Sequence, residues 1–109
     1  MPTTYKVLGQ SAPSATTATT LYTVPSATST VVSTITICNR DTAAGTFRVA
    51  IRPAGATLAN QHYIAFDSSV QANDTITLTL GITLATTDII TVYASSANFS
   101  FNAYGSEIS

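Results

Sequence analysis

The segment 30–39, TVVSTITICN, decides the fold of this chain. Seven of its ten residues are β-branched, and such side chains favour a pleated, half-buried strand. The hydrophobic pattern has a period of two, so one face is expected to carry Val31, Ser33, Ile35 and Ile37. The residues between them are expected on the opposite face. The pattern therefore predicts a long strand with one side in the core.

The same two-residue rhythm recurs on both sides of this segment. The repeats lie at 21–24, 46–52, 61–67, 75–80, 89–94 and 98–104. Turn-forming residues separate them about every 8–12 residues, which is the spacing of an all-β sandwich. We therefore expect an all-β fold: a single antiparallel β-sandwich of about seven or eight strands, with a jelly-roll or an immunoglobulin-like Greek-key order.

Alternation also predicts which side chains share a face within each strand. His62, Ile64 and Phe66 are expected on one side of their strand, and Tyr63 and Ala65 on the other. In the segment 75–80 the apolar residues Ile76, Leu78 and Leu80 are expected to point inward. Gly81 is expected to form a kink or bulge after them.

The first 20 residues differ from the rest of the chain. From Gly9 to Thr20 the sequence is mostly Ser, Ala and Thr, and it offers no residues for a core. We expect residues 1–20 to form an extended N-terminal arm, with room for a short strand at Tyr5–Leu8, and residues 21–109 to form the sandwich domain. Such an arm is a candidate contact segment.

The charge content excludes several classes of partner. Only 8% of the residues are charged, whereas about 25% is typical of a soluble domain. Four Lys and Arg residues at a net charge of −1 cannot build a basic patch for nucleic acid. No apolar run is long enough for a transmembrane helix, so no membrane partner is expected. The N-terminus lacks the pattern of a signal peptide, so we expect synthesis in a cytoplasm.

The sheet edges pose a physical problem because the chain has a single lysine. Natural sheets protect their edges with Lys, Pro or bulges, whereas the outward faces predicted here are rows of Thr. Thr is present 21 times. We infer that edges or outer faces are covered by other subunits, including further copies of this chain.

Residues that carry chemistry are few and scattered. His62 is the only histidine, and Cys38 lies in a strand, so no nucleophile, base and orienting group are expected together. The four aspartates fall at expected strand ends or turns, where Asp satisfies backbone N–H groups. A calcium site at converging aspartates is the alternative. We expect no enzyme activity, no cofactor and no metal.

Two arginines are candidates for partner contact. Arg48 and Arg52 are expected on the same outward face of one strand, roughly 13 Å apart at ~3.3 Å per residue. Arg is favoured at protein interfaces because its planar fork binds carboxylates at two points. The alternative is that both are solvated charges that keep the strand soluble. The predicted contact residues are Arg48, Arg52, His62 and Tyr63.

Several segments of the chain also resemble small virion structural proteins of tailed phages. The resemblance covers about four-fifths of the chain, from Leu21 to Ile108. It is carried by the segments LYTVP (21–25), ICNR (37–40), FRVAIRPAG (47–55), NQHYIAFD (60–67) and AYGSE (103–107).

The resemblance implies a non-enzymatic subunit of the phage particle. Its expected role is to bind the capsid surface as a cement, or decoration, protein, with the major capsid protein and copies of itself as partners. A neck, collar, tail or baseplate protein is the alternative. The location would be the virion, after synthesis in the host cytoplasm. A carbohydrate-binding adhesion module is a second alternative, although such sites usually expose aromatic platforms and Trp is absent here.

Overall fold

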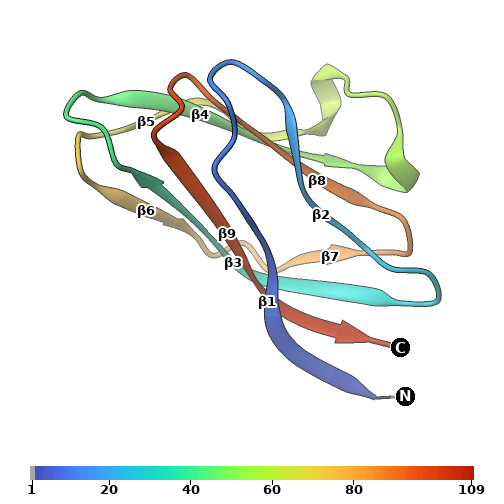
Figure 1. Ribbon diagram of the computed structural model, residues 1–109. Coiled ribbons are helices and arrows are strands. Elements are labelled where there is room, and N and C mark those ends of the chain that lie inside the picture. Colours follow the sequence, from blue (N-terminus) through green and yellow to red (C-terminus); the bar gives the residue numbers. More distant parts are fainter. Residues whose placement is uncertain (1) are drawn as a thin grey trace.

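The computed structural model describes residues 2–109 and is built almost entirely from β-strands (Figure 1). The strands are β1 (Thr3–Ser11), β2 (Thr19–Thr23), β3 (Ser29–Asn39), β4 (Gly45–Arg52), β5 (Tyr63–Val70), β6 (Thr75–Leu78), β7 (Ile82–Leu84), β8 (Ile89–Ala94) and β9 (Phe99–Ile108). Two three-residue 3-10 turns, η1 (Pro53–Gly55) and η2 (Asn60–His62), follow β4. In residues 2–109 no helix has the length and apolar character needed to cross a lipid bilayer.

The strands form two antiparallel sheets. Sheet A has the order β1-β9-β3-β6, with β7 also paired to β3, and sheet B has the order β2-β8-β4-β5. Because β6 and β7 share one edge position along β3, the nine strands fill eight positions. This arrangement is the jelly-roll order of two sheets with four strand positions each, in which the chain crosses repeatedly from one sheet to the other. The predicted antiparallel sandwich is confirmed, and of its two candidate topologies the jelly roll is the one observed.

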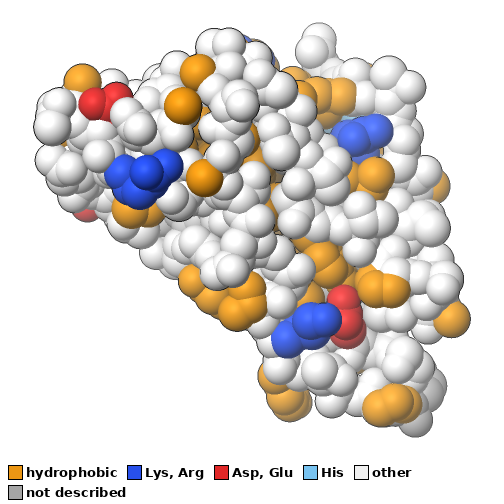
Figure 2. Space-filling model, viewed as in Figure 1, with side chains coloured by type: hydrophobic (Ala, Val, Ile, Leu, Met, Phe, Trp, Pro, Cys, Tyr) orange, Lys and Arg blue, Asp and Glu red, His pale blue; other side chains and the backbone are white. Residues whose placement is uncertain are grey.

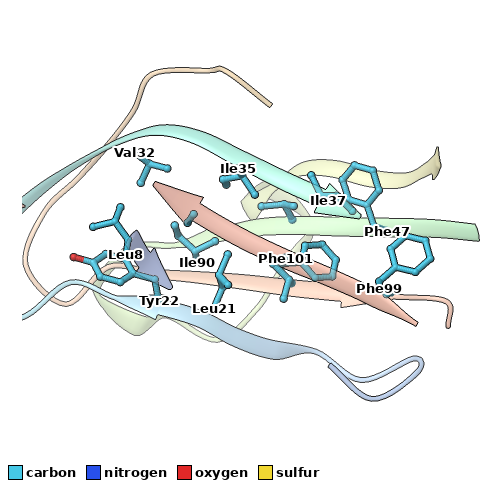
Figure 3. Close-up of a cluster of buried hydrophobic side chains, with 14 of the residues drawn as sticks. Leu8, Leu21, Tyr22, Val32, Ile35, Ile37, Phe47, Ile90, Phe99 and Phe101 are labelled. Atoms are coloured by element: carbon cyan, nitrogen blue, oxygen red, sulfur yellow. The ribbon is translucent and has the colours of Figure 1, made fainter. Parts of the chain in front are cut away.

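The core lies between the two sheets. Phe47 of β4 and Phe101 of β9 are fully buried, and their rings meet edge to face with centroids 6.3 Å apart. Phe99 packs beside Phe101 from the same strand, and Ile35 and Ile37 lie on the adjacent strand β3 of the same sheet (Figure 3). The alternation predicted for β4 and β9 therefore places their large side chains in the core.

The N-terminal segment differs from the expected extended arm. Its first part is the nine-residue strand β1, which pairs with β9 from Thr3↔Ile108 to Ser11↔Phe101. Leu8 is buried in the core, and Gly9 lies so close to β2 that a Cβ there would overlap the carbonyl of Leu21. The partner strand lies at the other end of the sequence, so local composition gave no sign of this pairing. Within residues 2–20, strand structure is absent at Pro2 and over residues 12–18, between β1 and β2.

A β-bulge changes the face pattern of β3. The register of β3 against β9 shifts between Val32 and Thr34, so one residue is inserted at Ser33. Val32 is therefore buried, while Val31 and Ser33 point away from the core. The expectation that Val31 and Ser33 share the inward face of Ile35 is wrong, because a one-residue insertion reverses the alternation on one side of it.

The break between β6 and β7 also interrupts the predicted alternation of faces. Ile76 and Leu78 pack against the core as predicted, but the strand ends at Leu78 and Leu80 is 56% exposed. Gly81 adopts a positive φ of 62°, which favours glycine, and the chain turns there before β7 begins. The predicted kink at Gly81 is confirmed, and the inward orientation of Leu80 is wrong.

Candidate functional site

A bulge in β5 builds the main feature of the outer face of sheet B. The register pairs Phe47 with Ser68 and Val49 with Ala65, so β5 uses one residue more than β4 over this stretch. Asp67 takes up the insertion with a φ of 51°. A bulge of this kind re-aims side chains and increases local twist. It brings two β5 residues, Phe66 and Asp67, to the single β4 residue Arg48.

Arg48 is held from three directions. Its Nε donates to Oδ1 of Asp67 at 2.7 Å, and its Nη2 donates to Oδ2 at 3.3 Å. Its guanidinium carbon lies 4.1 Å from the ring centroid of Phe66 and 4.3 Å from that of Tyr93. These are cation–π distances on both neighbours. These contacts therefore hold the side chain of Arg48 in one orientation on the surface.

Tyr63 completes the cluster from the beginning of β5. Its ring meets Phe66 edge to face, with centroids 4.9 Å apart and planes at 86°. We name the five residues Arg48, Tyr63, Phe66, Asp67 and Tyr93 the aromatic–arginine patch. Phe66 is 54% exposed although its ring is contacted on two sides. The expectation that Phe66 and Tyr63 lie on opposite sides of β5 is wrong, because register shifts in β5 interrupt the alternation.

The electrostatics of the patch follow from the pairing of Arg48 with Asp67. The hydrogen bond from Arg48 lowers the pKa of Asp67 below its usual value, and the same bond raises the pKa of Arg48. Both groups are charged at neutral pH, and they cancel each other locally. The patch thus presents aromatic surface and oriented polar atoms without net charge.

Arg52 lies on the same strand face as Arg48, as predicted, but it has a different set of contacts. Its guanidinium donates to the carbonyl oxygens of Ala56 at 2.7 Å and Gly55 at 3.2 Å. A longer contact of 3.4 Å reaches the hydroxyl of Thr91 on β8. Arg52 therefore fastens the segment after β4 over the outer face of sheet B, and it is not part of the patch.

His62 is next to Tyr63 in the sequence but not in the patch. It closes the turn η2 and is only 9% exposed. Its Nδ1 accepts a hydrogen bond from the backbone N–H of Ala59 at 3.1 Å. Of the four predicted contact residues, the structure brings Arg48 and Tyr63 together and places His62 and Arg52 apart from them.

Three of the four aspartates satisfy backbone N–H groups at turns, as predicted. Asp41 accepts from Thr42, Asp74 accepts from Thr75, and Asp88 accepts from Ala54 and Ala85, at 2.7–2.8 Å. The pKa of Asp41 is lowered, first by a side-chain hydrogen bond from Asn98. Within residues 2–109 no group of three or more His, Cys, Asp or Glu side chains has an arrangement suited to a metal ion.

Three residues of the patch, Phe66, Asp67 and Tyr93, were not among the predicted contacts. Phe66 fits the strict alternation of a core strand, and Asp67 has the appearance of a strand-end cap. One local feature of the sequence could have indicated the bulge in β5: an aspartate directly follows a run of strand-forming residues, a pattern that is compatible with a bulge as well as with a turn. Only the pairing of β5 with β4 reveals that both residues meet Arg48.

Comparison with known proteins finds no relative of this chain. No family model, no curated protein and no solved structure matches it.

Proposed function

We propose that this chain is a non-enzymatic structural subunit of a tailed-phage particle that binds the capsid surface as a cement, or decoration, protein. Its partners are the major capsid protein and further copies of itself. The aromatic–arginine patch is the surface that contacts the capsid. The resemblance of its segments to small virion proteins supports the setting, and the composition of the patch supports the mode of action.

The observation that carries this proposal is the exposed, pre-ordered ring of Phe66. Phe, Tyr and Arg are enriched at the centres of protein interfaces, and four of the five patch residues belong to these types. The ring is 54% exposed, yet Tyr63 and Arg48 hold it in place. A partner that covers it gains apolar burial and immobilises few side-chain torsions, so the entropy cost of binding is low.

The low charge of the exterior also suits an assembled particle. Figure 2 shows Lys, Arg, Asp and Glu side chains only as small, separate groups on one face of the molecule. Uncharged surface costs less to desolvate than charged surface, and a buried unpaired charge is the most costly. Many copies with weak individual contacts would bind a capsid lattice strongly through avidity.

The experiment compares the binding of two variants to capsids assembled from the major capsid protein of the same phage. Replacing Phe66 with Ala is expected to weaken binding by about 2 kcal/mol, roughly 30-fold, which is typical of an interface hot spot. The matched control is Leu80→Ala, since Leu80 is 56% exposed and lies outside the patch. The control is expected to bind like the wild type.

Equal binding of wild type and Phe66→Ala would contradict the proposal that the patch contacts the capsid. Absence of binding by the wild-type protein would contradict the cement role itself. If the protein is instead recovered with the neck, collar, tail or baseplate of purified particles, the alternative position in the virion replaces the capsid.

A carbohydrate-binding role is favoured by one specific observation. Sugars stack on exposed aromatic rings and are oriented by polar groups beside them, and Phe66 lies beside the carboxylate of Asp67. A glycan array tests this second candidate directly. Binding that is lost in Phe66→Ala would support it, and an array without any bound glycan would remove it.

A further inference from the structure

Strand β1 is an open edge of sheet A. It pairs with β9 on one side, and within residues 2–109 no strand lies on its other side. Every residue of β1 except Leu8 is exposed or half-buried, and Tyr5 is 83% exposed. Figure 1 places β1 at the periphery of the molecule, with both chain termini close to its outer end. The backbone groups on this edge can therefore accept another strand.

The other sheet edges are interrupted. On sheet B, β2 has a register shift between Thr20 and Tyr22, and β5 has two shifts. On sheet A, the edge opposite β1 consists of β6 and β7, which are four and three residues long and separated by the turn at Gly81. Short or bulged edges resist pairing with another sheet.

In β1, by contrast, the stretch Thr3–Val7 is continuous. Its pairing with β9 runs without a shift from Ile108 to Tyr104, and the only irregularity follows Val7. The hydrogen bond from the Ser109 N–H to the Pro2 carbonyl, at 3.1 Å, extends this order to the end of the strand. Five regular residues are enough for a strand pair of average length.

The one charged residue on this edge is already paired. Lys6 places its Nζ 3.3 Å from Oε1 of Glu107 on the neighbouring strand β9. A lysine that reaches back over its own sheet and meets a carboxylate repels an approaching strand less than a free lysine does. The usual electrostatic protection of an edge is therefore weak here.

The outward-facing row along this edge carries no charge. The cross-strand pairs on the outer face are Thr3–Ile108, Tyr5–Ser106 and Val7–Tyr104. Tyr5 and Val7 are 83% and 46% exposed. A symmetric contact brings each charge of a surface against its own copy, so an uncharged row with exposed apolar groups suits a second copy of the same chain.

We propose that β1 pairs antiparallel with β1 of a second copy, with Tyr5 opposite Tyr5 of the partner subunit. This register places Thr3 opposite Val7 of the partner subunit, which is a β-branched pair of the kind that stabilises sheets. Lys6 then lies opposite Thr4 of the partner subunit. A symmetric register centred on Lys6 would oppose the two lysines, and one centred on Thr4 would place Pro2, which has no N–H group, within the ladder.

In this register the two copies of residue 5 meet on the twofold axis of the dimer, and the test places a charge at that position. Wild-type protein is expected to sediment as a dimer at high micromolar concentration, and Tyr5→Lys is expected to sediment as a monomer because like charges meet on the axis. A mixture of Tyr5→Lys and Tyr5→Glu is expected to restore the dimer, since position 5 faces its own copy. The matched control is Thr23→Lys, which adds the same charge to an exposed position on the edge strand β2; this control is expected to remain dimeric.

Three results would overturn the inference: a monomeric wild type, a Tyr5→Lys variant that remains a dimer, or a mixture that remains monomeric while both variants give the circular-dichroism spectrum of the folded wild type. The proposed function includes further copies of this chain as partners, and the β1 contact rests on the proposed function only in that respect. Its failure is distinguishable, because capsid binding is tested at Phe66 on sheet B.

Discussion

A single buried amide at the end of β3 gives the sharpest stability prediction. Asn39 is fully buried, and its Nδ2 lies 2.9 Å from the carbonyl oxygen of Ala43 and 3.2 Å from those of Val70 and Gln71. Its Oδ1 accepts from the backbone N–H of Asp41 at 2.9 Å. The side chain therefore ties the end of β3 to the loop before β4 and to the turn after β5.

Replacing Asn39 with Ala removes all of these bonds. The contact with Val70 is buried, so its carbonyl loses this donor at a place that water does not readily reach, at a cost of about 1–3 kcal/mol. The bonds to Ala43, Gln71 and Asp41 are partly buried, and water can replace part of each. We expect a total loss of about 2–4 kcal/mol, a large share of the ~5–15 kcal/mol that stabilises a typical domain.

The assay is the free energy of unfolding from urea titration. The matched control is Asn102→Ala, because Asn102 also lies on a strand of sheet A but makes a single exposed side-chain bond, 2.8 Å long, with Gln10. The control is expected to change stability by less than about 0.5 kcal/mol. A loss below about 1 kcal/mol for Asn39→Ala would refute the role of this amide as a buried junction.

Three further predictions concern the strand contact of β1 and two titrating groups. Gly9→Ala should cost about 1–3 kcal/mol in thermal unfolding, because its Cβ would overlap the backbone of β2. Arg48→Ala should return the lowered pKa of Asp67 toward its ordinary value in an NMR titration. The stabilisation from the Arg48–Asp67 pair is fully present at pH values above the ordinary pKa of the carboxyl, and it is lost as the pH falls through the lowered pKa. Burial, and after it Glu107, raise the pKa of Tyr22 to about 12, so Glu107→Gln should lower that pKa in an ultraviolet titration. The stabilisation that comes from keeping the phenol neutral is present below the ordinary pKa of 10.0 and is lost as the pH rises through about 12.

The sandwich was predictable because its long strands keep a strict alternation. In β4 and β9, Phe47, Val49, Phe99 and Phe101 face the core as the two-residue period requires. The hydrophobic face of a strand is a local property of the sequence, and it is the same whichever strands pair with that strand. The assignment of these segments to an all-β core therefore needed no structure.

The bulges were not predictable from the same pattern. Ser33 in β3 and Asp67 in β5 each accompany a register shift, and each shift depends on how the strand pairs with a neighbour, which is β9 for β3 and β4 for β5. Alternation assigns faces only while the register is unbroken. For this reason the sequence placed Phe66 on the side of the strand opposite Tyr63, whereas the two rings meet on the surface beside Arg48.

The candidate interaction surface was predictable only in part. Arg48 and Tyr63 were expected at the surface, and they belong to the patch. Arg52 was expected with them, but the carbonyls of Gly55 and Ala56 engage its guanidinium. Those carbonyls become available only because the chain after β4 folds back over the sheet, and no spacing of residues along the strand encodes that.

Cryo-electron microscopy of an intact phage particle tests the proposed role most directly, because it shows the position of this chain. We predict jelly-roll density on the outside of the capsid shell, with the outer face of sheet B, and Phe66 in particular, against the major capsid protein. Particles without this density at any position, or density in which Phe66 faces solvent, would contradict this prediction.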